Sequence, residues 1–485
     1  MKIVAVCAFL LGTMVPALAQ DQARPSAVIH HAVSANAQAQ AAFDRGLLDY
    51  YAYNPEAAEH EFYTAADLDR HLAMAYWGIA ISNAPNLNVD PTDDRDEQAR
   101  EAIQRAKKLE TYATPEDQQL INAAAVRFDG DKKAKTDTLE IAYRDALQQI
   151  AIANPNDPDV ATLYAEAALY VTVHSATVPF DKMTPEQTAA FQAEAAKLLP
   201  MFQTYLAKFP QQVGLLHFYI HAAQIAGQSR VAVGAAKQLA TFGFPLEDSH
   251  LTHMPGHTFF DVGMYDDALG VATRSVDMDN AAIDCCHPGY YSANRYYHYH
   301  NVAFLLYAMA QTGHTADAVA LAQREDNVDF MARSYVADQR WKDVLALPYV
   351  KGQDYTLTFA RGLAYAKLGD ANSAQQALAD MPKAPADSPW RAALFNTMSL
   401  VLAAEISEVN HNDAKALQEL SDASAVAVKL NGDEYPALYY YSPHLALAVL
   451  AAKLGRADVE QAALQAELAA SPRSKKAMQM LAQLR

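Results

Sequence analysis

Cysteine is nearly absent from this chain, which limits how its fold can be stabilised. Only three cysteines occur in 485 residues, and the first, Cys7, lies close to the start. The other two, Cys285 and Cys286, are neighbours and cannot build a disulfide framework. They leave three possibilities open: a strained vicinal disulfide, a thiolate ligand, or two thiols in a loop. Packing of apolar side chains must hold the protein together.

Basic charge is also scarce, because 38 lysines and arginines face 56 acidic residues and leave a net charge of −18. A strongly acidic chain disfavours nucleic acid and anionic membranes as partners. We find no glycine-rich phosphate loop, no G-x-S-x-G elbow, no zinc-ribbon spacing and no C-x-x-C pair. Whether the protein is an enzyme stays open at this stage.

Alternating runs of Val, Ile and Thr are scarce, whereas Ala and Leu dominate, so an all-α protein is predicted. The first 19 residues, MKIVAVCAFLLGTMVPALA, have the charge, apolar run and A-x-A site of a secretory signal. No later stretch approaches the roughly 20 apolar residues of a membrane span. We therefore expect an exported protein, periplasmic or secreted, without a transmembrane segment. Residues 20–35 are expected to form a flexible arm, in which His30 and His31 would lie.

A helical-hairpin pattern recurs along the rest of the chain. A turn glycine follows one helix, with small residues before and after it and a large residue further on. The clearest units are LTFARGLAYAKLGDANSAQQALADM, with Gly369 at the turn, and LALAVLAAKLGRADVEQAALQAELAASP, with Gly455. A third unit, FDRGLLDYYAYNPEAAEHEFYTAA, places Tyr53 where the turn glycine belongs. Small residues let the paired helices approach, and the large residue fills the space between units.

These units resemble the tetratricopeptide repeat family, which has a 34-residue hairpin unit. The segments AFDRGLLDYYAYNPEAA, HLAMAYWGIAIS, LLHFYIHAA, HMPGH and YHNVAF resemble a subfamily of exported bacterial repeat proteins. The resemblance implies a right-handed α-solenoid of degenerate TPR-like hairpins, over residues 36–485 as one unit, with a less regular region near 108–200. Connections are expected at 83–96, 174–187, 279–295 and 431–443, and a helix start at Thr184-Pro185-Glu186.

Histidines are concentrated in three successive repeats of this register. With Gly227, Gly263 and Gly313 at the turn, the histidines fall on positions 2, 5 and 9 of their first helices. The resemblance implies that this stripe lines the concave groove, where the family holds ligands. The groove residues that we expect to bind a ligand are His217, His221, His250, His253, His257, Asp261, Tyr297 and His300.

An H-x-x-x-H pair on a helix supplies two ligands to a metal ion. We therefore predict a metal site formed by His217, His221, His253 and His257. Nitrogen ligands suit Zn, Cu, Fe or Ni, and the sequence does not choose among them. H-F-Y-I-H lacks the glutamate that zinc peptidases use, so no protease follows. Pro255 interrupts the helix that carries three of the histidines and threatens their alignment.

Two alternatives to a metal remain: the rings contact a ligand directly, or they only bond to one another and to nearby tyrosines, among them Tyr296 and Tyr299. The functional hypotheses are accordingly a scaffold that holds a peptide, protein segment or small ligand in its groove, a metal-dependent enzyme or metal carrier, and an assembly factor without a site. Fold alone does not separate them.

Overall fold

The computed structural model describes residues 24–27, 29–89, 92–128, 136–176, 178–285, 291–351, 354–383, 388–430 and 437–484. The predicted signal at residues 1–19 and Cys286 lie outside these ranges. So do the side chains of residues 136–137, 181, 284–285 and 291–296. The predictions for the two cysteines and for the Tyr296 side chain therefore fall on parts of the chain that the structure does not describe.

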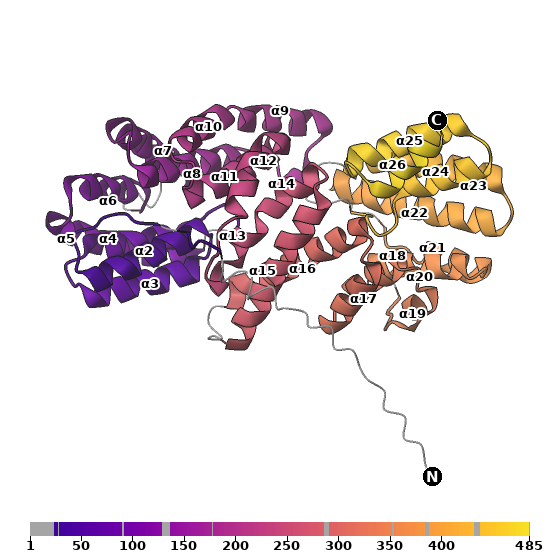
Figure 1. The fold of residues 1–485 in the computed structure, drawn as a ribbon, viewed down its shortest axis with the longest axis horizontal. Helices are drawn as coiled ribbons and strands as arrows, with labels where there is room; N and C mark the ends of the chain where they lie inside the picture. The colour runs from indigo at the N-terminus through magenta and orange to yellow at the C-terminus, as the bar shows by residue number, and fades with distance from the viewer. Residues whose placement is uncertain are drawn as a thin grey trace, which may run out of the picture.

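The described residues form an all-α solenoid, and no strand occurs among them. Helices follow one another in adjacent antiparallel pairs along an elongated molecule (Figure 1). The first part contains α2 Ala37–Tyr51, α3 Pro55–Leu68, α4 Ala73–Ser82, α5 Asp93–Leu109, α6 Pro115–Phe128, α7 Thr136–Ala153, α8 Pro158–His174, α9 Pro185–Ala196, α10 Leu199–Lys208, α11 Val213–Ile225 and α12 Val233–Leu239.

Among the described residues, four helices form the middle of the molecule, and ten α-helices follow them in its last part. The middle contains α13 Ser249–His253, α14 Pro255–Asp261, α15 Tyr265–Cys285 and α16 Tyr291–Thr312. The last part contains α17 Thr315–Arg324, α18 Val328–Ala337, α19 Trp341–Ala346, α20 Tyr355–Lys367, α21 Ala371–Ala379, α22 Pro389–Val409, α23 Asp413–Ala427, α24 Pro443–Lys453, α25 Ala457–Ala470 and α26 Lys475–Gln483.

The turn glycines confirm the repeat register. Each glycine that we placed at the turn has a left-handed backbone, with φ between +64° and +87°. The residue after each one donates its N–H five residues back, as in Gln228 to the Ala223 carbonyl at 2.8 Å. This is the bond that closes a helix C-terminus around a left-handed residue. The glycines concerned are Gly227, Gly263, Gly313, Gly369 and Gly455.

Tyr53 occupies the same position in the first hairpin and adopts φ 56° despite its side chain. The N–H of Asn54 closes the turn on the Asp49 carbonyl at 3.0 Å. A non-glycine residue here is strained, and such strain persists only where the surroundings enforce it. The ring of Tyr53 is buried and stacks on Phe218 of α11 at 5.2 Å between centroids.

Small residues bring the first helices together, as the pattern predicts. A Cβ atom on Gly46 of α2 would approach the Phe62 ring to 2.9 Å, and one on Gly78 of α4 would collide with the same ring. Phe62 of α3 is fully buried between them. The region near 108–200 also consists of packed helix pairs, and Thr184 begins α9 with a capping box.

The connection expected at 279–295 is corrected, because α15 continues to Cys285 and α16 already begins at Tyr291. The sequence DNAAIDC contains neither proline nor glycine to end the helix, and the packing of α15 on α16 supports the extension. The connection at 83–96 is shorter than expected as well. Thr92 caps α5, which starts at Asp93 with three aspartates in its first turn.

The flexible arm expected at residues 20–35 is also corrected over its described part. Ile29, His31 and Val33 are buried, and the Ala27 N–H donates to the Gly243 carbonyl at 3.4 Å. Residues 24–27 and 29–36 thus lie on the solenoid. Tertiary contacts, which composition does not reveal, hold this segment in place.

The apolar run that forms α22 was not expected from the sequence. Among the described residues, α22 alone has the length and hydropathy to cross a membrane, with a mean hydropathy of 1.3 over its most apolar window. A core helix of a solenoid passes the same test, and 56% of that window is buried. Its residues Met398, Val401 and Leu402 pack in the C-terminal core. Packing between repeats is sufficient to account for its apolar character.

The buried apolar residues form two large clusters with a small third one between them. The first extends from Ile29 to Ala308, and the second from Val319 to Ala477. The C-terminal hairpin returns to the middle of the molecule, where a Cβ atom on Gly263 would collide with the Pro472 carbonyl. The ring of Tyr439 also packs on Tyr307 at 5.3 Å.

Candidate metal centre

Six histidines from four helices converge in the first core, beside the strained turn at Tyr53. They form two groups of three, and within each group one ring nitrogen per residue lies within 4.8 Å of the others. α11 supplies two rings, α13 two, and α14 and α16 one each. The first group is His217, His221 and His250, and the second group is His253, His257 and His300.

The first group is open toward its own centre. His217 Nδ1 donates to the Tyr51 carbonyl at 2.6 Å, so its Nε2 carries the lone pair. That Nε2 is buried and has no hydrogen-bond partner, and the same holds for His221 Nε2 and His250 Nδ1. The His217 ring lies 4.8 Å from His221 and 5.0 Å from His250 between centroids. Buried polar atoms without a partner are rare and call for an explanation.

The second group is linked by hydrogen bonds. Gln224 Nε2 lies 3.0 Å from His257 Nδ1, and His257 Nε2 lies 2.9 Å from His253 Nε2. With Gln224 as the donor, His257 carries its proton on Nε2 and donates it to His253. The ring of His300 lies 4.7 Å from His253, and Phe304 closes the apolar side of the group.

All six rings are held neutral. Burial lowers the pKa of His217 to about 4 and that of His300 to about 4. Burial, followed by repulsion from neighbouring rings, lowers the pKa of the other four well below the usual value. Neutral imidazole is the form that binds a metal ion, so no proton has to leave before an ion enters.

The predicted metal set is divided by the structure. His217 and His221 belong to the first group, whereas His253 and His257 belong to the second. The rings of His221 and His257, which we expected to share one point, have centroids 6.3 Å apart. The register placed all the rings on one wall, but it did not state which neighbours meet. His250 and His300 complete the two groups, and both are among the predicted ligand-binding residues.

Of the two remaining predicted residues, one lies at the centre and one turns away. The Tyr297 ring lies 4.5 Å from His250, and its hydroxyl accepts from Asn88 Nδ2 at 3.0 Å. Asp261 instead accepts a hydrogen bond from Ser229 and is in neither group. Tyr299, expected near the mouth of the groove, stacks on Phe330 at 4.6 Å.

Pro255 does not destroy the alignment. It begins α14 directly after α13, and Met254 between them keeps helical angles of φ −52° and ψ −38°. The chain therefore follows a nearly continuous helical path through the interruption. His253 and His257 remain one turn apart and in contact.

Two carboxamide side chains were missed by the sequence reasoning. Gln224 lies three residues after His221 and falls at position 12 of the repeat, on the same groove stripe, so the register could have found it. Asn88 Nδ2 lies 3.4 Å from His250 Nε2 and belongs to the connection after α4. No local pattern predicts that this connection reaches α13.

Another buried histidine, His31, lies among carboxylates at the edge of the same core. His31 Nε2 is 3.0 Å from Asp117 Oδ1, and its Nδ1 is 3.6 Å from Asp159 Oδ2. Burial opposes the charged form, but the hydrogen bonds to these carboxylates raise its pKa to about 10. His31 is thus a cation held by buried aspartates, unlike the six neutral rings.

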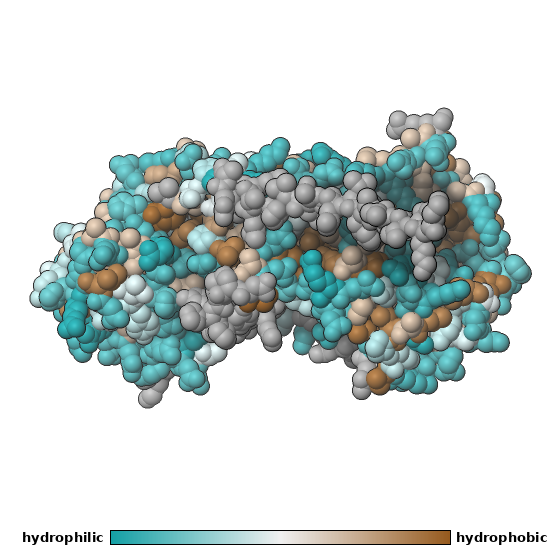
Figure 2. Space-filling model, turned by 60° about the horizontal axis from the view of Figure 1, so that its bottom comes forward, coloured by the Kyte–Doolittle hydropathy of each residue, from teal (hydrophilic) through white to brown (hydrophobic). Residues whose placement is uncertain are grey.

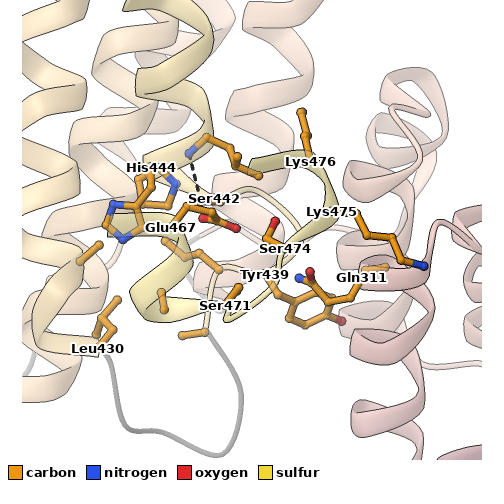
Figure 3. Close-up of a pocket in the computed structure, with 17 residues that line it drawn as sticks. Gln311, Leu430, Tyr439, Ser442, His444, Glu467, Ser471, Ser474, Lys475 and Lys476 are labelled. Carbon is orange, nitrogen blue, oxygen red and sulfur yellow. Dashed lines mark hydrogen bonds between the residues drawn. The ribbon is translucent and has the colours of Figure 1, made fainter. Parts of the chain in front are cut away.

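A cavity of about 150 Å³ lies elsewhere, between the end of α16 and the C-terminal helices (Figure 3). Ser442, His444, Glu467 and Lys476 line it, with Ser442 donating to Glu467 at 2.5 Å. His444 bonds through Nδ1 to Ser424 at 2.7 Å. The cavity contains none of the six histidines. Hydrophilic residues cover much of the face shown in Figure 2, with smaller apolar patches among them.

No protein-family model and no curated protein matches the chain. Among solved structures, the chain is similar to the human IFIT1 dimer with m7Gppp-AAAA, at 12% identity and a TM-score of 0.30, over 91% of this chain and 89% of that one. It is also similar to the APC/C hetero-tetramer Cut9–Hcn1, at 11% identity and 0.30, over 93% and 90%. Yeast Tom70 follows at 12% and 0.25, over 92% and 94%. Similarity at this level carries no functional argument, and the assignment as a TPR-like solenoid rests on the helices and turns above.

Proposed function

We propose that this protein is an exported helical-repeat protein that binds transition-metal ions at the two three-histidine groups. The observation that carries the proposal is the first group, whose three rings lie close together and each keep one buried nitrogen without a hydrogen-bond partner among the described residues. An unpaired buried polar atom costs about 1–3 kcal/mol, so three together are unfavourable unless a ligand satisfies them. A metal ion accepts the lone pairs of all three rings once a half-turn of the Asn88 amide places its oxygen against His250 Nε2 and moves the proton of that ring off Nδ1.

The partners outside the rings support this assignment. Metal-bound histidines usually donate their other N–H to a carbonyl or carboxylate, which fixes the tautomer. The Tyr51 carbonyl fulfils this role for His217 at 2.6 Å. In the second group a half-turn of the Gln224 amide would let its oxygen accept from His257 Nδ1. The proton between His257 and His253 would then be absent, and both Nε2 lone pairs would face the ion.

The spacing in the groups is compatible with this chemistry. Two nitrogens that share a tetrahedral ion at about 2.0–2.1 Å lie about 3.4 Å apart. The ring nitrogens within each group are separated by up to 4.8 Å, and His253 and His257 by 2.9 Å. Rotations of the side chains about χ1 and χ2 bridge these differences without a backbone rearrangement.

Metal analysis of the purified protein tests the proposal. We expect two transition-metal ions per chain after reconstitution and dialysis, and about one in a variant with His217→Gln and His221→Gln. His60→Gln with His71→Gln is the matched control, because both of these histidines are exposed. The control should keep two ions. Thermal unfolding, followed in each variant, checks that the fold is intact.

A protein that retains its helical fold but binds no ion under these conditions would overturn the proposal. Equal metal loss in the exposed-histidine control would do the same, because the ions would then be bound at the surface. An ion bound only by His217, His221 and His250 would restrict the proposal to the first group.

A scaffold role is a second candidate, favoured by the solenoid and by the cavity beside α24. A peptide or protein segment could occupy that cavity with the metal groups intact. Capture of a defined segment by the wild type, and its loss when Lys476→Glu changes the charge of the cavity wall, would support this role. Retention of the segment by this variant would exclude the cavity as its site.

A further inference from the structure

We infer that the two groups form one copper centre that holds two cuprous ions in preference to divalent zinc. This inference rests on the proposed function and specifies the ions of the same site. It follows from the charge and the number of the ligands.

The ligands of both groups are uncharged. Each group consists of three histidines, and no carboxylate or thiolate of the described residues belongs to either one. The polar groups that the described residues place beside the rings include the Tyr51 carbonyl, the amides of Asn88 and Gln224, and the tyrosines Tyr53 and Tyr297. Asp261, the carboxylate that we expected here, is hydrogen-bonded to Ser229.

Two histidines of α16, His298 and His300, differ in the groups that they contact. His298 of α16 contacts Asp279 at 3.3 Å and Glu325 at 2.8 Å. His300 lies two residues later and faces His253 and His257. On the same helix, His298 therefore contacts two carboxylates, whereas His300 contacts two imidazole rings.

Moving an ion from water into a buried site without negatively charged ligands costs free energy, and this cost increases with the charge of the ion. The energy of moving an ion out of water rises with the square of the charge, so a divalent ion costs roughly four times as much as a monovalent one. Two zinc ions would bring four positive charges to neighbouring groups whose ligands supply no negative charge. Two cuprous ions bring half that charge.

The number of ligands leads to the same conclusion. Zinc is almost always four-coordinate in proteins, with anionic ligands in many sites. A cuprous ion has a filled d shell and is stable with three ligands. Imidazole is also a good ligand for copper. Three nitrogens per ion therefore complete the shell of cuprous copper, whereas zinc would have to keep a water molecule as its fourth ligand in each group.

The two groups are close enough to affect each other. Ring centroids across the boundary are separated by 6.1 Å for His250 and His253 and by 6.3 Å for His221 and His257. Charge placed in one group is felt in the other through a medium of low dielectric constant. Monovalent ions therefore reduce the repulsion that would prevent both groups from filling.

Competition between ions tests the inference. The full-length protein is stripped of metal and then titrated anaerobically with cuprous copper or with zinc against chelators of known affinity. We expect two cuprous ions per chain, bound at least about 100-fold more tightly than zinc. X-ray absorption should show about three nitrogen neighbours per copper and no sulfur.

A charge-changing variant provides the sharper measurement. Gln224→Glu adds a carboxylate beside His257 while it keeps the shape of the side chain. We expect it to reduce the preference for cuprous copper over zinc by about 10–100-fold. Gln203→Glu on α10 is the matched control, because it adds the same charge at an exposed position. Its new carboxylate can accept from the Tyr219 hydroxyl in place of the bond that the amide donates, so the preference between the ions should stay unchanged.

The outcomes separate this inference from the proposed function. Two zinc ions bound as tightly as copper would overturn the inference and leave metal binding intact. A wild-type preference that Gln224→Glu leaves unchanged would overturn its electrostatic basis. A protein that binds neither ion would overturn the proposed function itself, and the inference with it.

Discussion

At the scale of single residues, the partner of each histidine decides whether it is a cation or a neutral ligand. His31 faces aspartates and carries a proton, whereas His217 faces a peptide carbonyl and remains neutral. The sequence reasoning placed His31 in a free arm and His217 on the groove wall. Only the second placement could be read from periodicity, since the carboxylates around His31 come from α6 and from the start of α8.

His31 should make stability depend on pH. Its pKa is raised from 6.5 to about 10 in the folded protein, so its contribution is complete below about pH 6.5 and is lost as the pH rises toward 10. Asp117, Asp157 and Asp159 face its ring, and Glu116 lies close by. We expect His31→Gln to lower the free energy of unfolding by about 3–5 kcal/mol at pH 6, because it leaves buried carboxylates unpaired.

Urea unfolding of wild type and variant at pH 6 and pH 10 measures this effect. The difference between the two proteins should shrink by more than half at the higher pH. A difference that is the same at both values would show that the ring acts by packing and not by its charge.

Tyr297 links the connection after α4 to the first histidine group. Its hydroxyl accepts from Asn88 and donates to the Tyr53 carbonyl at 3.4 Å. We expect Tyr297→Phe to destabilise the protein by about 1–2 kcal/mol, because the Asn88 amide loses a buried partner. Metal affinity should fall by less than tenfold, since all six rings remain. Calorimetry and metal titration check both values, and a complete loss of metal would make Tyr297 a ligand.

At the scale of the elements, turns with a left-handed residue set the register. Glycine at these turns is visible in the sequence, and five of them adopt the expected backbone. The predicted connection at 279–295 is wrong because α15 continues to Cys285 with no proline or glycine to end it earlier. Helix propensity is a weak local signal, and packing of α15 on α16 extends both helices.

Gly263 should be less tolerant of substitution than the other turn glycines. Gly263→Ala would strain a backbone with φ +74° and also drive a methyl group into the Pro472 carbonyl. Gly455→Ala is the control, because φ is +68° there and the space around it is open. We expect about 1 kcal/mol of destabilisation for Gly455→Ala and at least about 3 kcal/mol for Gly263→Ala. Equal losses in chemical denaturation would mean that the C-terminal hairpin does not press on this turn.

At the scale of the whole molecule, the histidine groups connect segments that are distant in the chain. α11, α13, α14 and α16 supply the rings, and the Tyr51 carbonyl of α2 joins them. The same tyrosine donates its hydroxyl to Asp159, which faces His31. The first core therefore contains one polar chain from the N-terminal segment to the candidate metal centre, and it meets the second core at Tyr439, which packs against both.

Metal loading should therefore stabilise the two halves unequally. Binding at 100 times the dissociation constant adds about 2.7 kcal/mol to the state that binds. We expect hydrogen exchange to slow in α11, α13, α14 and α16, with little change in α20–α25. Mass spectrometry of the metal-free and loaded protein measures both regions. Uniform slowing along the chain would indicate one cooperative unit, and no slowing near the histidines would place the ion elsewhere.

The sequence by itself determined the helical repeats, their register and the identity of the six histidines, because turn glycines, small residues and helical spacing act over a few residues. It could not determine how the rings are grouped, that Asn88 reaches them, or that residues 29–33 lie on the core. Those features depend on contacts between segments that lie as much as 209 residues apart, as for Asn88 and Tyr297, or 244 residues apart, as for Tyr53 and Tyr297. Such contacts are selected by packing of the whole chain, and only the tertiary structure contains them.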